Sequence, residues 1–182
     1  MKRLAALTLI STSALAAVGV VAAVAATHTT HPATTTTSRA TPWCSNATIR
    51  ISVGRANGAA GTIYHPIIFT NHSTSACLIS GVASLQPGNS GNPFIPIGPS
   101  ASNDSMGMMG IEITLAPGQS ASDDMGVVET GNYTVSTCRP VTVTAVAVRL
   151  GSISATASFG PYSVCRLRPS TTTRLLARGT QG

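Results

Sequence analysis

Ser90, in the stretch Pro-Gly-Asn-Ser-Gly-Asn-Pro-Phe (87–94), is the residue whose setting comes nearest to that of a catalytic nucleophile. A nucleophilic serine needs a base within hydrogen-bond reach, a carboxylate that orients the base, and N–H groups that stabilise the oxyanion. The only histidines after residue 43 are His65 and His72, and neither lies in a sequence context typical of such a base. Glycine, asparagine and serine near proline are common turn residues. We therefore interpret Ser90 as part of a turn and expect no catalytic residue.

Two other groups of side chains could bind a ligand or move a proton. His65 follows Tyr64 in an apolar run, and we expect it to be half-buried and hydrogen-bonded to the backbone rather than to act as a ligand or base. Asp123, Asp124 and Glu129 could together offer oxygen atoms to calcium. No Asp-x-Asp-x-Asp loop supports such a site, so we expect these carboxylates to be exposed charges at a strand end.

Neither a cofactor nor a metal is expected elsewhere in the chain. Residues 54–61 are rich in glycine but lack the Gly-Lys-Ser/Thr of a phosphate-binding loop. His28 and His31 lie in a threonine-rich stretch, where two solvated histidines are the expected state. The cysteines show none of the short Cys-x-x-Cys spacings that zinc prefers.

Three methionines stand close together in Ser-Asn-Asp-Ser-Met-Gly-Met-Met-Gly (102–110). Methionine is flexible and apolar, so Met106, Met108 and Met109 could form an adaptable surface for a partner. In the alternative, the loop folds onto the domain and these side chains fill the edge of the core. We expect burial, and we retain the three methionines as the best candidates for partner contact.

Arginines gather at the C-terminal end, where Arg166, Arg168, Arg174 and Arg178 fall within the last seventeen residues. We interpret residues 167–182 as a basic flexible tail, and Arg166 and Arg168 as candidates for contact with anionic polymers of the cell envelope. Between the outermost cysteines, four arginines stand against five carboxylates, which leaves one net negative charge. A nucleic-acid-binding domain should carry a basic face on its folded surface. We therefore expect no nucleic-acid partner, although the whole chain has a formal charge of +6.

The first 26 residues predict an export signal. Lys2 and Arg3 precede a long uncharged run that ends in small residues typical of a signal-peptidase site. The run could also span a bilayer as an uncleaved anchor, but its Ala, Val, Ser and Thr content favours cleavage. Residues 27–42 are half threonine and contain two prolines, which predicts a disordered linker whose hydroxyl groups could carry sugars.

Four cysteines in an exported chain predict two disulfides, because thiols outside the cytoplasm are usually oxidised. They fall into an early and a late pair along the sequence. We expect Cys44 to pair with Cys77 and Cys138 with Cys165, although four cysteines allow three connectivities.

Alternating apolar residues predict β-strands from the first cysteine onward. Apolar positions alternate in residues 49–53, 111–115 and 153–159, and an apolar run from 62 to 70 contains Pro66, which predicts a bulge or an edge strand there. Residues 141–150 change phase near Ala145, which predicts a β-bulge. Turns are expected at Asn57-Gly58, Pro117-Gly118 and Gly160-Pro161. Short strands without a helical period predict an all-β fold, an immunoglobulin-like antiparallel β-sandwich over residues 43–166.

Three stretches, 58–77, 115–122 and 131–148, resemble an exported actinobacterial family, the domain of unknown function number four-two-three-two. The shared features are a Gly-Ala-Ala-Gly turn, a Phe-Thr-Asn strand end, a Leu-x-Pro-Gly turn and four cysteines in matching order. After the second cysteine the chain departs from the family, since Gly81 leads into Val-Ala-Ser-Leu (82–85). The resemblance implies a secreted or membrane-tethered β-sandwich behind a Ser/Thr/Pro-rich linker, and it brings no catalytic residues.

The sequence favours a non-enzymatic module of the cell envelope that binds an unknown protein or glycan partner through loops. The membrane would be involved only through an uncleaved N-terminal segment. Two alternatives are a structural or surface-display protein with a glycosylated linker at residues 27–42, and a hydrolase of uncharacterised mechanism.

Overall fold

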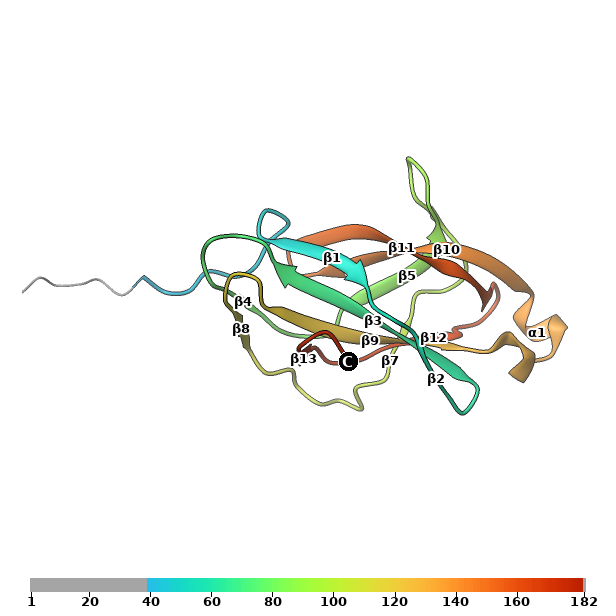
Figure 1. Ribbon diagram of the computed structural model, residues 1–182. Helices are drawn as coiled ribbons and strands as arrows, with labels where there is room; N and C mark the ends of the chain where they lie inside the picture. The colour runs from blue at the N-terminus through green and yellow to red at the C-terminus, as the bar shows by residue number, and fades with distance from the viewer. Residues whose placement is uncertain (1–38, 182) are drawn as a thin grey trace, which may run out of the picture. The chain divides into compact units, whose positions relative to one another are not determined.

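A computed structural model describes residues 39–181 (Figure 1). Two β-sheets face each other and form a sandwich, as predicted. The larger sheet has the strand order β1-β3-β9-β12-β7, with β2 paired to β3 and β13 paired to β9. Its strands are β1 (Ile49–Val53), β2 (Asn57–Ala59), β3 (Thr62–Asn71), β7 (Ser102–Asn103), β9 (Ser120–Val128), β12 (Thr171–Thr173) and β13 (Ala177–Arg178).

The smaller sheet has four strands in the order β11-β10-β5-β6. They are β5 (Ser84–Asn89), β6 (Ile95–Pro96), β10 (Pro140–Leu150) and β11 (Ile153–Cys165). Strands β4 (Cys77–Ile79) and β8 (Ile113–Leu115) form a separate pair. The described helical turns are η1 (Thr130–Asn132) and α1 (Val135–Cys138), both at the end of the molecule where β9 leads into β10. All strand pairs are antiparallel except β12 with β7.

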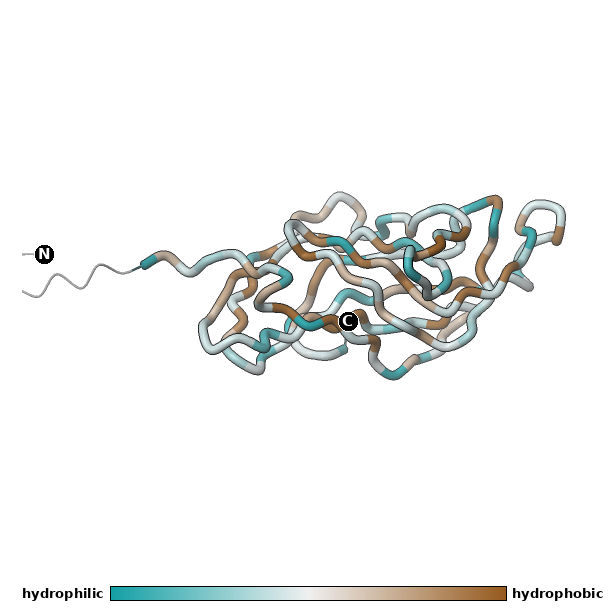
Figure 2. Tube along the Cα trace, turned by 90° about the horizontal axis from the view of Figure 1, so that it is seen from above, coloured by the Kyte–Doolittle hydropathy of each residue, from teal (hydrophilic) through white to brown (hydrophobic). Residues whose placement is uncertain are grey.

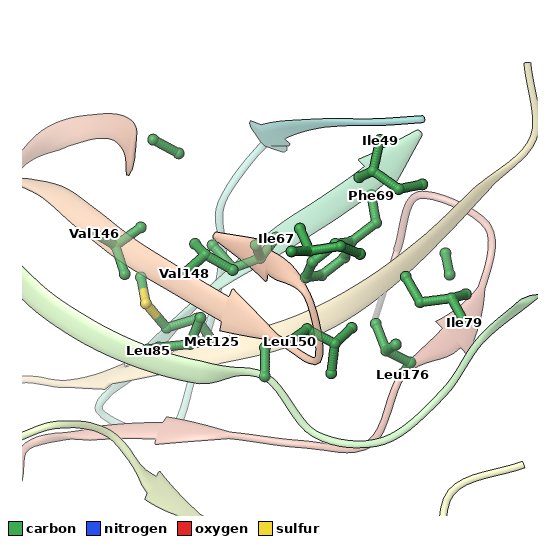
Figure 3. Packing of buried hydrophobic residues seen from close by; sticks show 14 of the residues in the cluster. Ile49, Ile67, Phe69, Ile79, Leu85, Met125, Val146, Val148, Leu150 and Leu176 are labelled. Atoms are coloured by element: carbon green, nitrogen blue, oxygen red, sulfur yellow. The ribbon is translucent and has the colours of Figure 1, made fainter. Parts of the chain in front are cut away.

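The core lies between the two sheets (Figure 3). Ile67 and Phe69 of β3 point from one sheet toward Val146 and Val148 of β10 in the other, and all four are fully buried. Hydrophobic and hydrophilic residues alternate along the strands in Figure 2, because successive side chains of a strand point to opposite faces.

Both predicted disulfides are present. Cys44 is bonded to Cys77, with a Cα–Cα distance of 5.0 Å, and Cys138 is bonded to Cys165, with a Cα–Cα distance of 4.5 Å. The first joins the start of the domain to β4, and the second joins α1 to the end of β11. Paired cysteines indicate an oxidising environment outside the reducing cytosol.

The alternation predicted the strands well and the turns less well. The register of β10 shifts between Val143 and Ala145, which confirms the predicted bulge. Asn57-Gly58, however, lies in β2, and the chain turns instead at Ala60 and Gly61, which have φ of 49° and 78°. The turn predicted at Gly160-Pro161 is also wrong, because β11 continues past the bulge to Cys165.

Pro66 lies in an inner strand rather than at an edge. Its carbonyl accepts a hydrogen bond from the N–H of Gly54 at 2.7 Å, at the break between β1 and β2. In an antiparallel pair a residue presents its N–H and C=O to the same neighbour. The N–H that proline lacks therefore faces this break, and the pairing of β3 with β9 runs through Pro66 without interruption.

The predicted flexible tail from residue 167 is wrong. Residues 170–178, called here the C-terminal segment, form β12 and β13 and pair with β9. Thr171, Thr173 and Leu176 are buried. The segment adds strands to an otherwise open edge of β9, so the folded domain extends beyond residue 166.

The predicted signal (1–26) and most of the predicted linker (27–42) lie outside the described residues, as do His28 and His31. Within residues 39–181, no helix is long and apolar enough to cross a membrane.

Candidate functional site

Ser90 lies in the hairpin between β5 and β6, which projects beyond its sheet in Figure 1. Its backbone N–H lies 3.5 Å from the hydroxyl of Thr144. His65 belongs to β3 in the other sheet, and His72 follows the end of that strand. The structure therefore does not bring Ser90 together with either histidine.

His65 is buried more deeply than predicted, with 2% of its surface exposed. Its ring lies edge-on to the rings of Tyr162, at a centroid distance of 4.3 Å, and Phe159, at 5.5 Å. The buried Nε2 atom has no hydrogen-bond partner among the described residues, so the expected hydrogen bond to the backbone is not formed through this atom. Burial lowers the pKa of His65 from its ordinary value of 6.5 and favours the neutral ring. His65 is buried this deeply because β3 is an inner strand of its sheet and the side chain at position 65 faces the opposite sheet.

Asp123 is fully buried, so the expectation of an exposed charge at a strand end is wrong for this residue. It lies in the middle of β9 opposite Ile67, on the face that carries the core. Its Oδ2 accepts the N–H of Ala83 at 3.1 Å and lies 2.6 Å from the hydroxyl of Thr173, and its Oδ1 accepts the N–H of Arg174 at 3.0 Å. Burial raises the pKa of the Asp123 carboxyl, and these three hydrogen bonds act in the opposite direction.

The other two carboxylates of the predicted group point elsewhere. Asp124 lies on the outer face of β9, where its Oδ2 is 3.8 Å from a guanidinium nitrogen of Arg174. Burial raises the pKa of Asp124, while the charge of Arg174 lowers it. Glu129 is exposed, just after β9 ends. Within residues 39–181, no group of three or more His, Cys, Asp or Glu side chains is placed to hold a metal ion.

The loop that carries the three methionines, residues 105–111, is called here the Met segment. Met106, Met108 and Met109 are 89%, 64% and 92% exposed, and Ile111 is 69% exposed. The expectation that these methionines would be buried is therefore wrong. The Met segment connects β7 to β8 along the edge of the larger sheet.

A tight turn holds the methionines away from the core. The N–H of Met108 donates to the carbonyl of Ser105 at 2.9 Å, and the N–H of Ser105 donates to Oδ1 of Asn103 at 2.9 Å. The two central residues of the turn, Met106 and Gly107, have φ of 49° and 74°. Glycine adopts this left-handed conformation readily, whereas a side chain such as methionine makes it unfavourable.

Met106 and Met108 border a hollow of about 340 Å³. Arg174 lies in its wall, where the guanidinium is 3.3 Å from Asp104 and lies 5.1 Å from the centre of the Tyr64 ring. The hollow is lined by Asp104, Ser105, Met106, Met108, Arg174 and Leu175. Flexible apolar side chains around a small recess with a fixed ion pair can adapt to the surface of a partner.

Arg166 and Arg168 lie at a different place, beside α1. The N–H of Arg166 donates to the carbonyl of Arg139 at 3.2 Å, and the guanidinium of Arg168 stacks over Tyr133 at 4.3 Å from the ring centre. Both side chains are exposed, and so is Leu167 between them. The predicted contact residues therefore form two separate surfaces.

The sequence did not predict a groove of about 700 Å³ on the outer face of the smaller sheet. Its floor comes from β5, β10 and β11, and its wall from the hairpin between β5 and β6. The pattern that could have indicated it is the row of small and polar residues at alternate positions of these strands.

Residues 44–173 match the model of a family described as a domain of unknown function, DUF4232. The match starts at the first disulfide cysteine and ends with β12, so it includes part of the C-terminal segment. No curated protein and no solved structure is significantly similar to the chain. Because the match covers both disulfides and most of the strands of both sheets, the protein belongs to the DUF4232 family.

Proposed function

We propose that this protein is exported and works as a non-enzymatic module of the cell envelope, which binds a protein or glycan partner through the Met segment. The observation that carries the proposal is the exposure of four large apolar side chains within six residues, Met106 to Ile111. The export signal expected in residues 1–26 and the two disulfides support an extracytoplasmic location.

The Met segment differs from the rest of the described surface. Other large hydrophobic residues with high exposure, such as Trp43, Ile95 and Val135, are far apart in the sequence. Single exposed apolar residues are normal in proteins, whereas a contiguous apolar patch often marks a contact site. The unfavourable backbone conformation of Met106 points the same way, because strain that does not aid folding is often found at functional sites.

Ser90 is exposed in the hairpin between β5 and β6, whereas His65 is buried in β3 of the other sheet, and this placement supports the non-enzymatic part of the proposal. Arg166 and Arg168 offer a second contact surface, whose positive charge suits anionic polymers of the envelope. Because this surface lies beside α1 rather than beside the Met segment, its removal should leave binding through the methionines intact.

The proposal can be tested by crosslinking in cells that export the full chain. A photoreactive amino acid is placed at position 108 in one protein and at position 135 in another. Val135 is a suitable reference, because it is apolar and 74% exposed but lies in α1. We expect a discrete crosslinked partner from position 108 and none from position 135.

A second set of variants tests whether the methionines themselves are needed. M106Q and M109Q are combined with the photoreactive group at position 108, and L167Q serves as the matched change of an exposed apolar residue. We expect the double variant to lose the crosslinked partner and L167Q to keep it. Identical capture from positions 108 and 135, consisting only of wall material, would contradict the proposal and favour a structural role for the linker.

A further inference from the structure

We propose that the groove on the outer face of the smaller sheet binds an acidic oligosaccharide, with Arg149 pairing with a carboxylate of the sugar. This inference goes beyond the proposed function, because the groove shares no residue with the hollow beside the Met segment. Either site could be lost without the other.

The floor of the groove is flat and rich in hydroxyl groups. Arg149 of β10 pairs with Ser84 of β5 on one side and with Ser154 of β11 on the other. The next row places Ala147 between Gln86 and Thr156. These short side chains leave the sheet surface open for a ligand to lie along it.

The hydroxyl groups of this floor are available. Ser84, Ser154 and Thr156 are exposed, and their hydroxyls form no hydrogen bond to any other described residue. Each hydroxyl can both donate and accept, which matches the hydroxyl groups of a sugar. A polar floor of this kind does not suit an apolar ligand.

One side of the groove is already fixed in position. The amide nitrogen of Gln86 donates to the carbonyls of Pro87 and Gly98, both at 3.1 Å, and its Oε1 accepts the hydroxyl of Ser100 at 2.7 Å. These bonds hold the side of the floor next to β6. A preformed site loses less conformational entropy when the ligand binds.

An aromatic and proline wall stands over this floor. Phe94, Pro93 and Pro96 line the groove from the hairpin between β5 and β6. The Phe94 ring packs on the backbone of Gly88, where an added Cβ would lie only 2.4 Å from the ring. The apolar C–H faces of a sugar can pack on such a wall while its hydroxyls bond to the floor.

The positive charge of Arg149 favours an oligosaccharide that carries negative charge over a neutral one. Arg149 forms no ion pair or hydrogen bond through its side chain with any described residue, and no carboxylate lines the groove. A guanidinium binds a carboxylate through two parallel hydrogen bonds.

The groove volume of about 700 Å³ is in the range of about 300–1,000 Å³ found for ligand sites. A peptide strand would more readily add to a sheet edge than lie across this face.

The test uses nuclear magnetic resonance and calorimetry on the full exported chain, with tetragalacturonate as the acidic probe and maltotetraose as the neutral probe of equal length. We expect tetragalacturonate to shift the backbone signals of β5, β10 and β11 near Arg149, and maltotetraose to bind more weakly. R149Q should weaken tetragalacturonate binding about tenfold or more, since a hydrogen bond to a charged group contributes that much. R50Q removes the same charge from β1 in the other sheet and should change binding less than twofold.

Three results would overturn the inference. One is equal weakening by R149Q and R50Q, which indicates attraction to net charge alone. Another is a set of shifted signals around Arg166 and Arg168 instead of the groove. The third is binding of tetraglutamate in the groove without binding of tetragalacturonate, which would assign the site to a peptide. Thermal unfolding of R149Q, expected to match that of the parent because Arg149 is exposed, serves as the folding control.

Discussion

The C-terminal segment and the Met segment lie next to each other, and each differs from what its hydropathy predicts. Polar residues are buried in the first, and apolar residues are exposed in the second. The C-terminal segment begins Ser-Thr-Thr-Thr-Arg, and its Ser170, Thr171 and Thr173 are buried. The Met segment contains four large apolar residues, and all four are exposed. Both contribute to the same hollow, through Arg174 and Leu175 from one and Met106 and Met108 from the other.

The difference shows that available partners, and not hydropathy alone, determine which segment is buried. The C-terminal segment meets an open edge of β9 and the carboxylate of Asp123, which accepts hydrogen bonds from Thr173 and Arg174. A buried polar group costs little when it is hydrogen-bonded. The Met segment contains no strand and pairs with no sheet edge, and its turn directs the methionine side chains outward.

Removing the carboxylate of Asp123 should have the largest effect on the burial of the C-terminal segment. D123A leaves the N–H groups of Ala83 and Arg174 without their acceptor, whereas the hydroxyl of Thr173 keeps the carbonyl of Ala83. Each buried donor left unpaired costs about 1–3 kcal/mol, so we expect a loss of roughly 2–6 kcal/mol in the free energy of unfolding, measured in urea. Trypsin should also cut more rapidly after Arg174 and Arg178. A D123A protein with unchanged stability and trypsin resistance would show that strand pairing alone holds the C-terminal segment.

A smaller effect is expected from T173V, which keeps the shape of the side chain but removes its hydroxyl. That hydroxyl lies 2.6 Å from Oδ2 of Asp123 and 2.9 Å from the carbonyl oxygen of Ala83. Its loss should cost about 1–2 kcal/mol in urea unfolding. T172V is the matched control, because the Thr172 side chain forms no hydrogen bond to another described residue. Equal effects of the two changes would mean that the Asp123 contact adds nothing.

The sequence predicted the strands and the disulfides, because these depend on local alternation and on cysteine chemistry. It could also have placed Asp123 inside: Ala121, Asp123, Met125 and Val127 occupy alternate positions of β9, and all are buried. The partners of Asp123 could not have been predicted, since Ala83 and Thr173 are 40 and 50 residues away. Whether the polar residues of the C-terminal segment are buried or exposed depends on such contacts with residues far away in the sequence.

The candidate sites were harder to predict for the same reason. The sequence identified the three methionines as unusual, but their exposure follows from a turn with two left-handed residues, Met106 and Gly107. The groove around Arg149 needs three strands and a hairpin brought together by the fold. No short motif marks it, because its residues are small and polar and occur on any solvent-facing strand.

The protonation of Asp123 should make the anchoring of the C-terminal segment depend on pH. The Thr173 hydroxyl has one proton and two nearby acceptors, so it can donate to an ionised Asp123, or accept from a protonated Asp123 and donate to Ala83. Burial raises the pKa of Asp123 in the folded state above its ordinary value of 3.8. The unfolded chain therefore releases this proton first as pH rises, and the contribution of Asp123 to stability falls between the unfolded and the folded pKa.

This dependence can be isolated by comparing the parent protein with D123N in urea at a series of pH values from about 3 upward. The difference in unfolding free energy should shrink as pH rises through the folded pKa and then level off. Two other groups contribute to both proteins: Asp124, whose raised pKa acts in the same sense, and His65, whose lowered pKa reduces stability as pH falls below 6.5. A difference that stays constant with pH would show that Asp123 has equal pKa values in the folded and unfolded states.

The smallest expected effect is a gain in stability from M106G. Met106 has φ of 49°, a conformation that costs an L-residue about 1–2 kcal/mol, and glycine removes this cost but adds freedom to the unfolded chain. We expect a net gain of up to about 1 kcal/mol in urea unfolding. M108G, at a position without a positive φ, should instead destabilise slightly. If M106G is more stable and yet fails to capture the partner, methionine at position 106 serves contact rather than folding; a less stable M106G would mean that its side chain supports the C-terminal segment after all.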